Sequence, residues 1–130
     1  MAAMAFREPN QVKWVGTRPG HNGEQVEKYN TATNGTAIVH TVTAGKTLYL
    51  VSAIIFPAAV NSGVGTVFIR DLLDAVWTYL VGMTGALNFG LIGQTLSLYH
   101  PIEVPEGYDI CVLSGGAGLT VYGAIHGWEE

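Results

Sequence analysis

One run of twelve residues, Gly45–Phe56 (GKTLYLVSAIIF), constrains the fold of this chain more than any other stretch. It opens at a glycine and is rich in β-branched and aromatic residues, which suit a pleated strand, and we expect the strand to end at Pro57. Strict alternation would place apolar residues on both faces, with Leu48, Leu50, Ile54 and Phe56 on one and Tyr49, Val51, Ala53 and Ile55 on the other. Either the strand is central and covered on both sides, or another subunit buries its outer face.

Other segments with strand character follow the same chemistry and are separated by turn signals. They are Thr36–Val42, Thr66–Asp71, Ala75–Val81, Gln94–Glu103, Tyr108–Leu113 and Leu119–Trp128. Residues 72–82 also fit a helical stripe, but Val76–Tyr79 has strand chemistry, which favours a turn at residues 72–74 followed by a strand. About eight short strands with no convincing helix predict an all-β fold, an antiparallel β-sandwich.

Residues 1–35 differ in kind from residues 36–130, which we expect to form the sandwich domain. The first segment is polar and rich in Asn, Gly, Thr and Glu. It is either a peripheral strand with loops packed on its own domain, or an arm that crosses onto a neighbouring subunit and orders only when docked. If such an arm docks on a larger assembly with a repeating lattice of subunits, the residues that we expect to contact that lattice are Arg7, Lys13, Trp14 and Arg18. A second irregular segment, Gly82–Gly93, contains four glycines and is predicted to be a long loop.

The chain is unusually poor in charge. Charged residues make up 12% of the sequence, about half of the ~25% typical of globular proteins. This indicates either that part of the surface is covered in an assembly, or that the surface is built from Thr, Ser, Asn and Gly. The net charge is −4, with no basic stripe, which argues against a nucleic-acid partner. No segment resembles a signal peptide or a membrane span, so we expect a soluble protein made in a cytosol, with no membrane partner.

The last predicted strand alternates cleanly. Its core face would carry Leu119, Val121, Gly123, Ile125 and Gly127, and its other face Thr120, Tyr122, Ala124, His126 and Trp128. Because aromatic residues concentrate at subunit contacts, the second face is a candidate oligomer interface. The residues that we expect at this interface are Tyr49, Phe68, Trp77, Tyr79, Tyr122, His126 and Trp128.

Residues that could carry catalysis do not form a recognisable constellation. The four histidines include no His-x-His pair, which disfavours a barrel metal site, and His40 and His100 are interpreted as hydrogen-bonded wall residues. Asp71 and Asp74 beside Arg70 are better explained by an ion pair at a strand end than by a glycosidase pair. The glycine-rich run at residues 114–118 is interpreted as a hairpin turn. The lone Cys111 lies in an apolar run and is expected to be buried and inert. We therefore expect no enzyme activity, no metal and no cofactor.

Several short motifs resemble those of small structural proteins of tailed bacteriophages. They are Ala44–Tyr49 opening a strand, then Ile69–Asp71, Pro101–Tyr108 and the ending Tyr122–Glu130, and together they cover roughly residues 36–130. The resemblance implies a jelly-roll sandwich similar in topology to tumour-necrosis-factor-like folds, assembled as a homotrimer. It implies a capsid decoration protein on the phage head, made in the host cytoplasm and located in the virion, with the major capsid protein or another virion protein as partner. The alternative is a carbohydrate- or receptor-binding domain of a phage fibre or tail, with glycans as partners.

Overall fold

A computed structural model describes residues 23–59, 63–85, 93–116 and 118–130, and in these residues it contains eight antiparallel strands and no helix. The strands are β1 (Glu24–Thr33), β2 (Gly35–Thr41), β3 (Leu48–Ala59), β4 (Gly63–Arg70), β5 (Val76–Gly85), β6 (Gln94–Val104), β7 (Asp109–Ser114) and β8 (Thr120–Glu129). The prediction of an all-β, antiparallel fold is confirmed.

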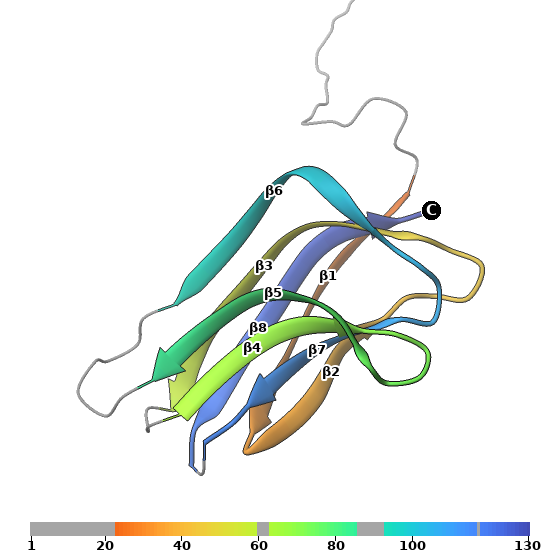
Figure 1. The fold of residues 1–130 in the computed structure, drawn as a ribbon. Coiled ribbons are helices and arrows are strands. Elements are labelled where there is room, and N and C mark those ends of the chain that lie inside the picture. The colour runs from red at the N-terminus through yellow and green to blue at the C-terminus, as the bar shows by residue number, and fades with distance from the viewer. Residues whose placement is uncertain (1–22, 60–62, 86–92, 117) are drawn as a thin grey trace, which may run out of the picture.

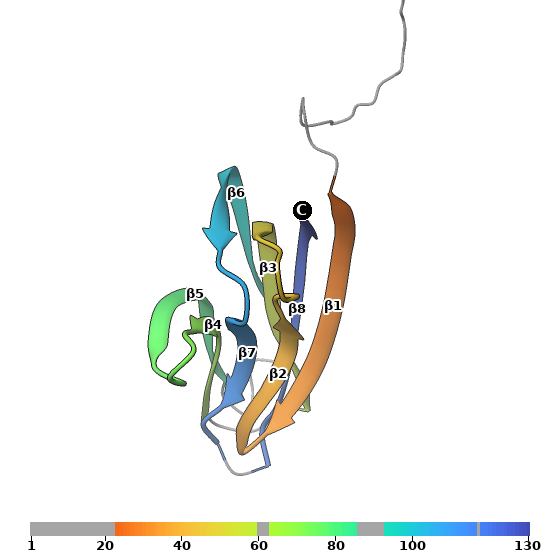
Figure 2. The same ribbon diagram turned by 90° about the vertical axis from the view of Figure 1, so that its right-hand side faces the viewer.

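The strands form two four-stranded sheets, with the orders β1-β8-β3-β6 and β2-β7-β4-β5. The two sheets lie face to face as two layers, which Figure 2 shows edge-on. The pairing is nested along the chain: the first strand, β1, lies beside the last, β8, then β2 beside β7 and β3 beside β6, and the two middle strands, β4 and β5, lie beside each other. This is the pairing of one long hairpin rolled onto itself, and it is consistent with the connectivity of a jelly roll.

The strand β3 is an inner strand of its sheet, lying between β8 and β6 (Figure 1). Its register shifts between Leu50 and Ser52, so Val51 is the extra residue of a β-bulge. The bulge reverses the alternation. Four residues of β3 therefore point into the core, namely Leu48, Leu50, Ala53 and Ile55, while Tyr49, Ser52, Ile54 and Phe56 are on the outer face. The expectation of strict alternation along this strand is wrong, because the expected pattern has no extra residue at position 51.

The expected end of this strand at Pro57 is also wrong, since β3 continues to Ala59. Pro57 lies opposite Val121 of β8, and the register shifts again directly after it. Proline lacks an N–H donor and is tolerated in a sheet mainly at bulges and edges. The bulge therefore explains why the strand can continue beyond Pro57.

The core fills the space between the sheets with aliphatic side chains from both layers. The fully buried residues of the first sheet include Leu48, Leu50, Ile55 and Val121, and those of the second include Val67, Ile69, Ile110 and Val112. The predicted core face of the last strand is confirmed, because Val121 and Ile125 of β8, and Leu119 just before it, are buried. Between them, Gly123 lets the sheets approach: a Cβ there would lie 2.9 Å from the Cβ of Val112.

The ambiguous segment after β4 is a turn followed by a strand, as predicted. The side chain of Asp71 accepts hydrogen bonds from the backbone N–H of Leu73 at 2.8 Å and of Ala75 at 3.0 Å, which closes the turn. Asp74 completes it with a φ of 63°, a left-handed conformation that Asp tolerates. The strand β5 then runs to Gly85, past the predicted boundary at Gly82.

The described part of the polar N-terminal segment includes one strand. Strand β1 is paired with β8 from Glu24, opposite Glu129, to Thr33, opposite Thr120. Two of its side chains, Val26 and Ala32, are buried in the core. The sandwich thus includes residues from the segment that precedes residue 36. β1 is one of the two edge strands of the sheet β1-β8-β3-β6 (Figure 1).

Candidate functional site

A buried polar contact joins the two sheets at one end of the sandwich. Oε2 of Glu129 on β8 lies 2.6 Å from Nε2 of His40 on β2 and accepts a hydrogen bond from the backbone N–H of Thr43 at 3.1 Å. Burial alone would raise the pKa of the Glu129 carboxyl, but the hydrogen bonds from His40 and Thr43 outweigh it and hold this pKa below its usual range. The expectation of a hydrogen-bonded wall histidine is confirmed for His40. It is wrong for His100, which is exposed, its ring set edge-on to that of Tyr99.

The expected ion pair at a strand end is present, with an additional partner. Nε of Arg70 lies 3.5 Å from Oδ1 of Asp74 and 3.0 Å from Oδ2 of Asp109 on β7. Asp109 also accepts a hydrogen bond from the hydroxyl of Thr41 at 2.6 Å. This network connects three neighbouring strands, β2, β7 and β4, and it places Asp74 and Asp109 on the same guanidinium group.

The lone cysteine and the residue types that bind metals are the remaining candidates for chemistry. Cys111 is fully buried, and its burial raises the pKa of its thiol, which disfavours the reactive thiolate. Across the part of the chain that the structure describes, no cluster of three or more His, Cys, Asp or Glu side chains is arranged to hold a metal ion. A search of the same residues for a helix suited to spanning a membrane finds none.

The residues predicted for one oligomer interface lie on opposite faces of the sandwich. Four of them, Tyr49, Tyr122, His126 and Trp128, are on the outer face of the sheet β1-β8-β3-β6. Phe68 and Tyr79 are paired with each other on the other sheet, and Trp77 is the extra residue of a bulge, where it packs edge-on against Tyr108. The seven residues therefore do not form one surface. The predicted arm residues Arg7, Lys13, Trp14 and Arg18 lie outside the described residues.

Two surfaces of the sandwich differ from the rest, one in the apolar side chains that it exposes and the other in being hollowed. The first, which we call the β5 patch, consists of Leu72, Leu73, Val76, Trp77 and Tyr79, large apolar side chains on β5 and on the turn before it. All five are exposed, from 44% for Trp77 to 88% for Leu73. β5 is an edge strand of its sheet, so within the described residues one side of its backbone has no partner strand (Figure 1).

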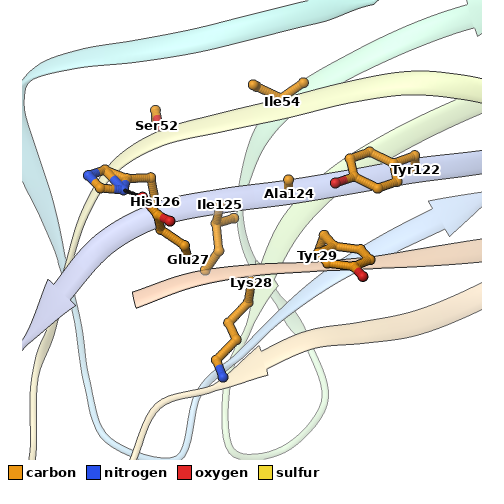
Figure 3. Close-up of a pocket in the computed structure, with 9 residues that line it drawn as sticks. All are labelled: Glu27, Lys28, Tyr29, Ser52, Ile54, Tyr122, Ala124, Ile125 and His126. Carbon is orange, nitrogen blue, oxygen red and sulfur yellow. Dashed lines mark ion pairs between the residues drawn. The ribbon is translucent and has the colours of Figure 1, made fainter. Parts of the chain in front are cut away.

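The second surface is a hollow of about 400 Å³ on the outer face of β1, β8 and β3, which we call the tyrosine groove (Figure 3). Its lining residues are Glu27, Lys28, Tyr29, Ser52, Ile54, Tyr122, Ala124, Ile125 and His126. The strand register explains the hollow. Ala124 lies between Tyr29 of β1 and Ile54 of β3, and its small side chain leaves space where its neighbours on β8 carry rings.

The two ends of the tyrosine groove differ in chemistry. At one end Tyr122 stacks against Tyr29, with ring centroids 5.4 Å apart, and against Phe56 at 4.5 Å. At the other end Nδ1 of His126 lies 3.2 Å from Oε2 of Glu27. Figure 3 shows the rings and the ion pair on opposite sides of Ala124. The groove thus offers an aromatic wall, a polar wall and a small floor.

Sequence reasoning identified Tyr122 and His126 but missed the other walls of this groove. Tyr29 and Glu27 come from the segment that precedes residue 36, whose pairing with β8 the sequence does not reveal. Ile54 and Ser52 reach the outer face together with Tyr49 only because of the bulge at Val51. The available signal was the alternation Glu27, Tyr29, Thr31, which matches a half-exposed strand.

A scan of the chain against protein-family models gives no match, and a search of curated proteins finds no relative.

Proposed function

We propose that this chain is a structural protein that works as an assembled part, a homotrimer that decorates the head of a tailed phage. The single observation that carries the self-assembly is the β5 patch. Five large apolar side chains exposed along one strand and turn form a surface that favours burial against another protein. The trimer and the virion come from the sequence resemblance, and the strand order of the two sheets is consistent with the jelly roll that this resemblance implies.

The composition of the patch favours a second copy of the same chain as its occupant. Trp77 and Tyr79 are residue types enriched at the energetic centres of interfaces, and Leu72 and Leu73 add aliphatic area beside them. The net charge of −4 is small, so two or three copies repel one another weakly at physiological salt. An edge strand beside the patch can also pair with a neighbouring backbone.

Measuring the mass of the full-length protein in solution tests the assembly. We expect about 41 kDa by light scattering coupled to size exclusion, three times the 13.8 kDa of one chain. The double variant Leu73→Ser, Tyr79→Ser should raise the dissociation constant of the assembly at least about tenfold, because two large apolar contacts are lost. Tyr99→Ser is the matched control, since Tyr99 is 90% exposed on the edge strand of the other sheet. A monomer at micromolar concentration would contradict the proposal.

Attachment to a virion needs a separate measurement. Co-sedimentation of the purified protein with phage heads assembled without it should show saturable binding, which the β5 patch variant weakens by loss of the trimer. A gene for a major capsid protein next to the gene for this chain would support the same conclusion. If the protein forms a trimer but does not bind heads, the proposed self-assembly is supported and the proposed decoration role is excluded.

A further inference from the structure

We propose that the tyrosine groove binds a neutral saccharide, with one sugar ring seated over Ala124 between Tyr122 and His126. This site is separate from the β5 patch, because the groove is on the outer face of β1, β8 and β3 whereas the patch is on the other sheet. The proposal of saccharide binding in the groove therefore does not depend on the proposed assembly through the β5 patch.

The dimensions of the groove suit a small ring. Tyr122 and His126 are four residues apart on β8, about 13 Å along an extended strand at roughly 3.3 Å per residue. The space between them is open because Ala124 has a small side chain, and Ser52, which lies opposite His126 on β3, is also small. A volume of about 400 Å³ falls in the range of small-molecule sites.

The lining of the groove combines aromatic rings with hydrogen-bonding groups, and a sugar requires both. A sugar ring carries C–H groups that pack on an aromatic surface and hydroxyl groups that need hydrogen-bond partners. The aromatic wall is formed by Tyr29 and Tyr122, whose hydroxyls are further donors and acceptors. The polar wall is formed by Glu27 and His126, and a carboxylate accepts strong hydrogen bonds from ligand hydroxyls.

The charges of the lining favour a neutral ligand over an ionic one. The Glu27 carboxylate already lies 3.2 Å from Nδ1 of His126, whereas the side chain of Lys28 points away from the hollow (Figure 3). An anion would face the Glu27 carboxylate, and a cation would compete with His126 for it. A purely apolar ligand would leave the polar wall without partners, which costs affinity.

The groove is held in shape before any ligand arrives. Its residues are on three adjacent strands of one sheet, and the stack of Tyr29, Tyr122 and Phe56 fixes the aromatic wall. Sites built on strands and supported by packed neighbours lose little conformational entropy on binding. We therefore expect weak but specific binding of a single ring, with a dissociation constant on the order of 1 mM.

The test uses methyl glycosides of glucose, galactose, mannose and N-acetylglucosamine, together with an array of larger glycans, on the full-length protein. Saturation-transfer NMR should show contact with at least one glycoside, and titration should shift the amide signals of residues 122–126. Ala124→Leu should fill the floor of the groove and lower affinity at least about tenfold. Tyr29→Ala should weaken binding by removing one ring of the aromatic wall. Thermal unfolding of both variants checks that the fold is unchanged.

The matched control is Tyr99→Ala, which removes a more exposed tyrosine outside the groove and should leave affinity unchanged. Binding that survives both Ala124→Leu and Tyr29→Ala, or that is lost equally in Tyr99→Ala, would overturn the assignment of this site. An absence of binding to every glycoside at about 50 mM and to every glycan on the array would overturn the ligand class.

Discussion

Glu129 shows how one residue is adapted to the space between the two sheets. Its side chain is only 4% exposed, and burying a carboxylate is unfavourable unless hydrogen bonds replace the lost water. His40 and Thr43 supply those bonds from the opposite sheet and from the chain that follows it. Since an ionised carboxylate can only accept hydrogen bonds, His40 donates from Nε2. The result is a polar link between β2 and β8.

Replacing Glu129 by Gln should lower the free energy of unfolding at pH 7 by roughly 1–3 kcal/mol, the range for hydrogen bonds to charged groups. The pKa of Glu129 is lowered by folding, so its contribution is present above the unfolded value of about 4.5 and is lost as pH falls through the folded value. The wild type should therefore lose stability below pH 4.5 more steeply than the variant. Urea unfolding between pH 7 and pH 3 measures this difference.

Glu103→Gln is the control for this prediction, because Glu103 is an exposed carboxylate on β6. It should leave the stability at pH 7 within about 0.5 kcal/mol of the wild type. Parallel pH profiles for the wild type and Glu129→Gln would show that the Glu129 carboxylate does not stabilise the fold.

For a single residue, the sequence predicts the environment better than it predicts the partner in a hydrogen bond or an ion pair. His40 could be expected to make a hydrogen bond, since a histidine in an apolar strand needs one. Its partner Glu129 is 89 residues away, and nothing local distinguishes it from other carboxylates. Arg70 shows the same limit, because the sequence predicts an ion pair with its neighbours Asp71 and Asp74 but gives no sign of the closer partner Asp109.

Among the elements, strand β8 depends on glycines that allow close contact with its neighbours. A Cβ at Gly127 would clash with the backbone oxygen of Tyr49 on β3, and neither of these backbone positions can move without disturbing the ladder. We expect Gly127→Ala to lower the free energy of unfolding by at least about 1–3 kcal/mol, the usual cost of overpacking a core. Thermal or chemical unfolding of the variant measures this loss.

Gly35→Ala is the matched control, because a Cβ at Gly35 would meet nothing closer than 3.8 Å. It should change stability by less than about 1 kcal/mol. If the two alanine variants were equally stable, the close approach of β3 and β8 would not limit the residue at position 127.

The bulge at Val51 explains why the position of β3 was predictable and its two faces were not. β-Branched content, turn residues and prolines located most of the strands, since these are local signals. A bulge adds one residue without changing the chemistry of the segment, so alternation counted from Leu48 gives the wrong face from Ser52 onward. The apolar character of both predicted faces of β3 reflects this shift, together with an outer face where Tyr49 and Phe56 stack on aromatic rings of β8.

For the whole molecule, the important result is that the aromatic residues are divided between two opposite surfaces. Tyr122 and His126 line the tyrosine groove on one sheet, whereas Trp77 and Tyr79 form the β5 patch on the other. The sequence could not separate them, because assignment to a sheet depends on long-range pairing. The separation means that an assembly formed through the β5 patch leaves the tyrosine groove open to a ligand.

Two truncations test where the folding unit begins. The described sandwich starts with β1, which covers the edge of β8 and buries Val26 and Ala32. Deleting residues 1–22 should therefore change the midpoint of thermal unfolding by only a few degrees and should preserve saccharide binding. Deleting residues 1–33 removes β1, exposes the edge of β8 and takes away the Tyr29 wall, so it should lower the midpoint by at least about 10 °C and promote aggregation.

The shorter truncation also separates folding from attachment. If residues 1–22 act as an arm that contacts the lattice, the protein that lacks them should keep its oligomeric mass but bind phage heads more weakly in the co-sedimentation assay. Unfolding of this truncation would show instead that residues 1–22 belong to the folding unit. Unchanged binding to heads would exclude the arm and leave attachment to surfaces of the sandwich. The comparison works because β1 is retained, so any lost binding arises from residues 1–22 and not from an opened sheet edge.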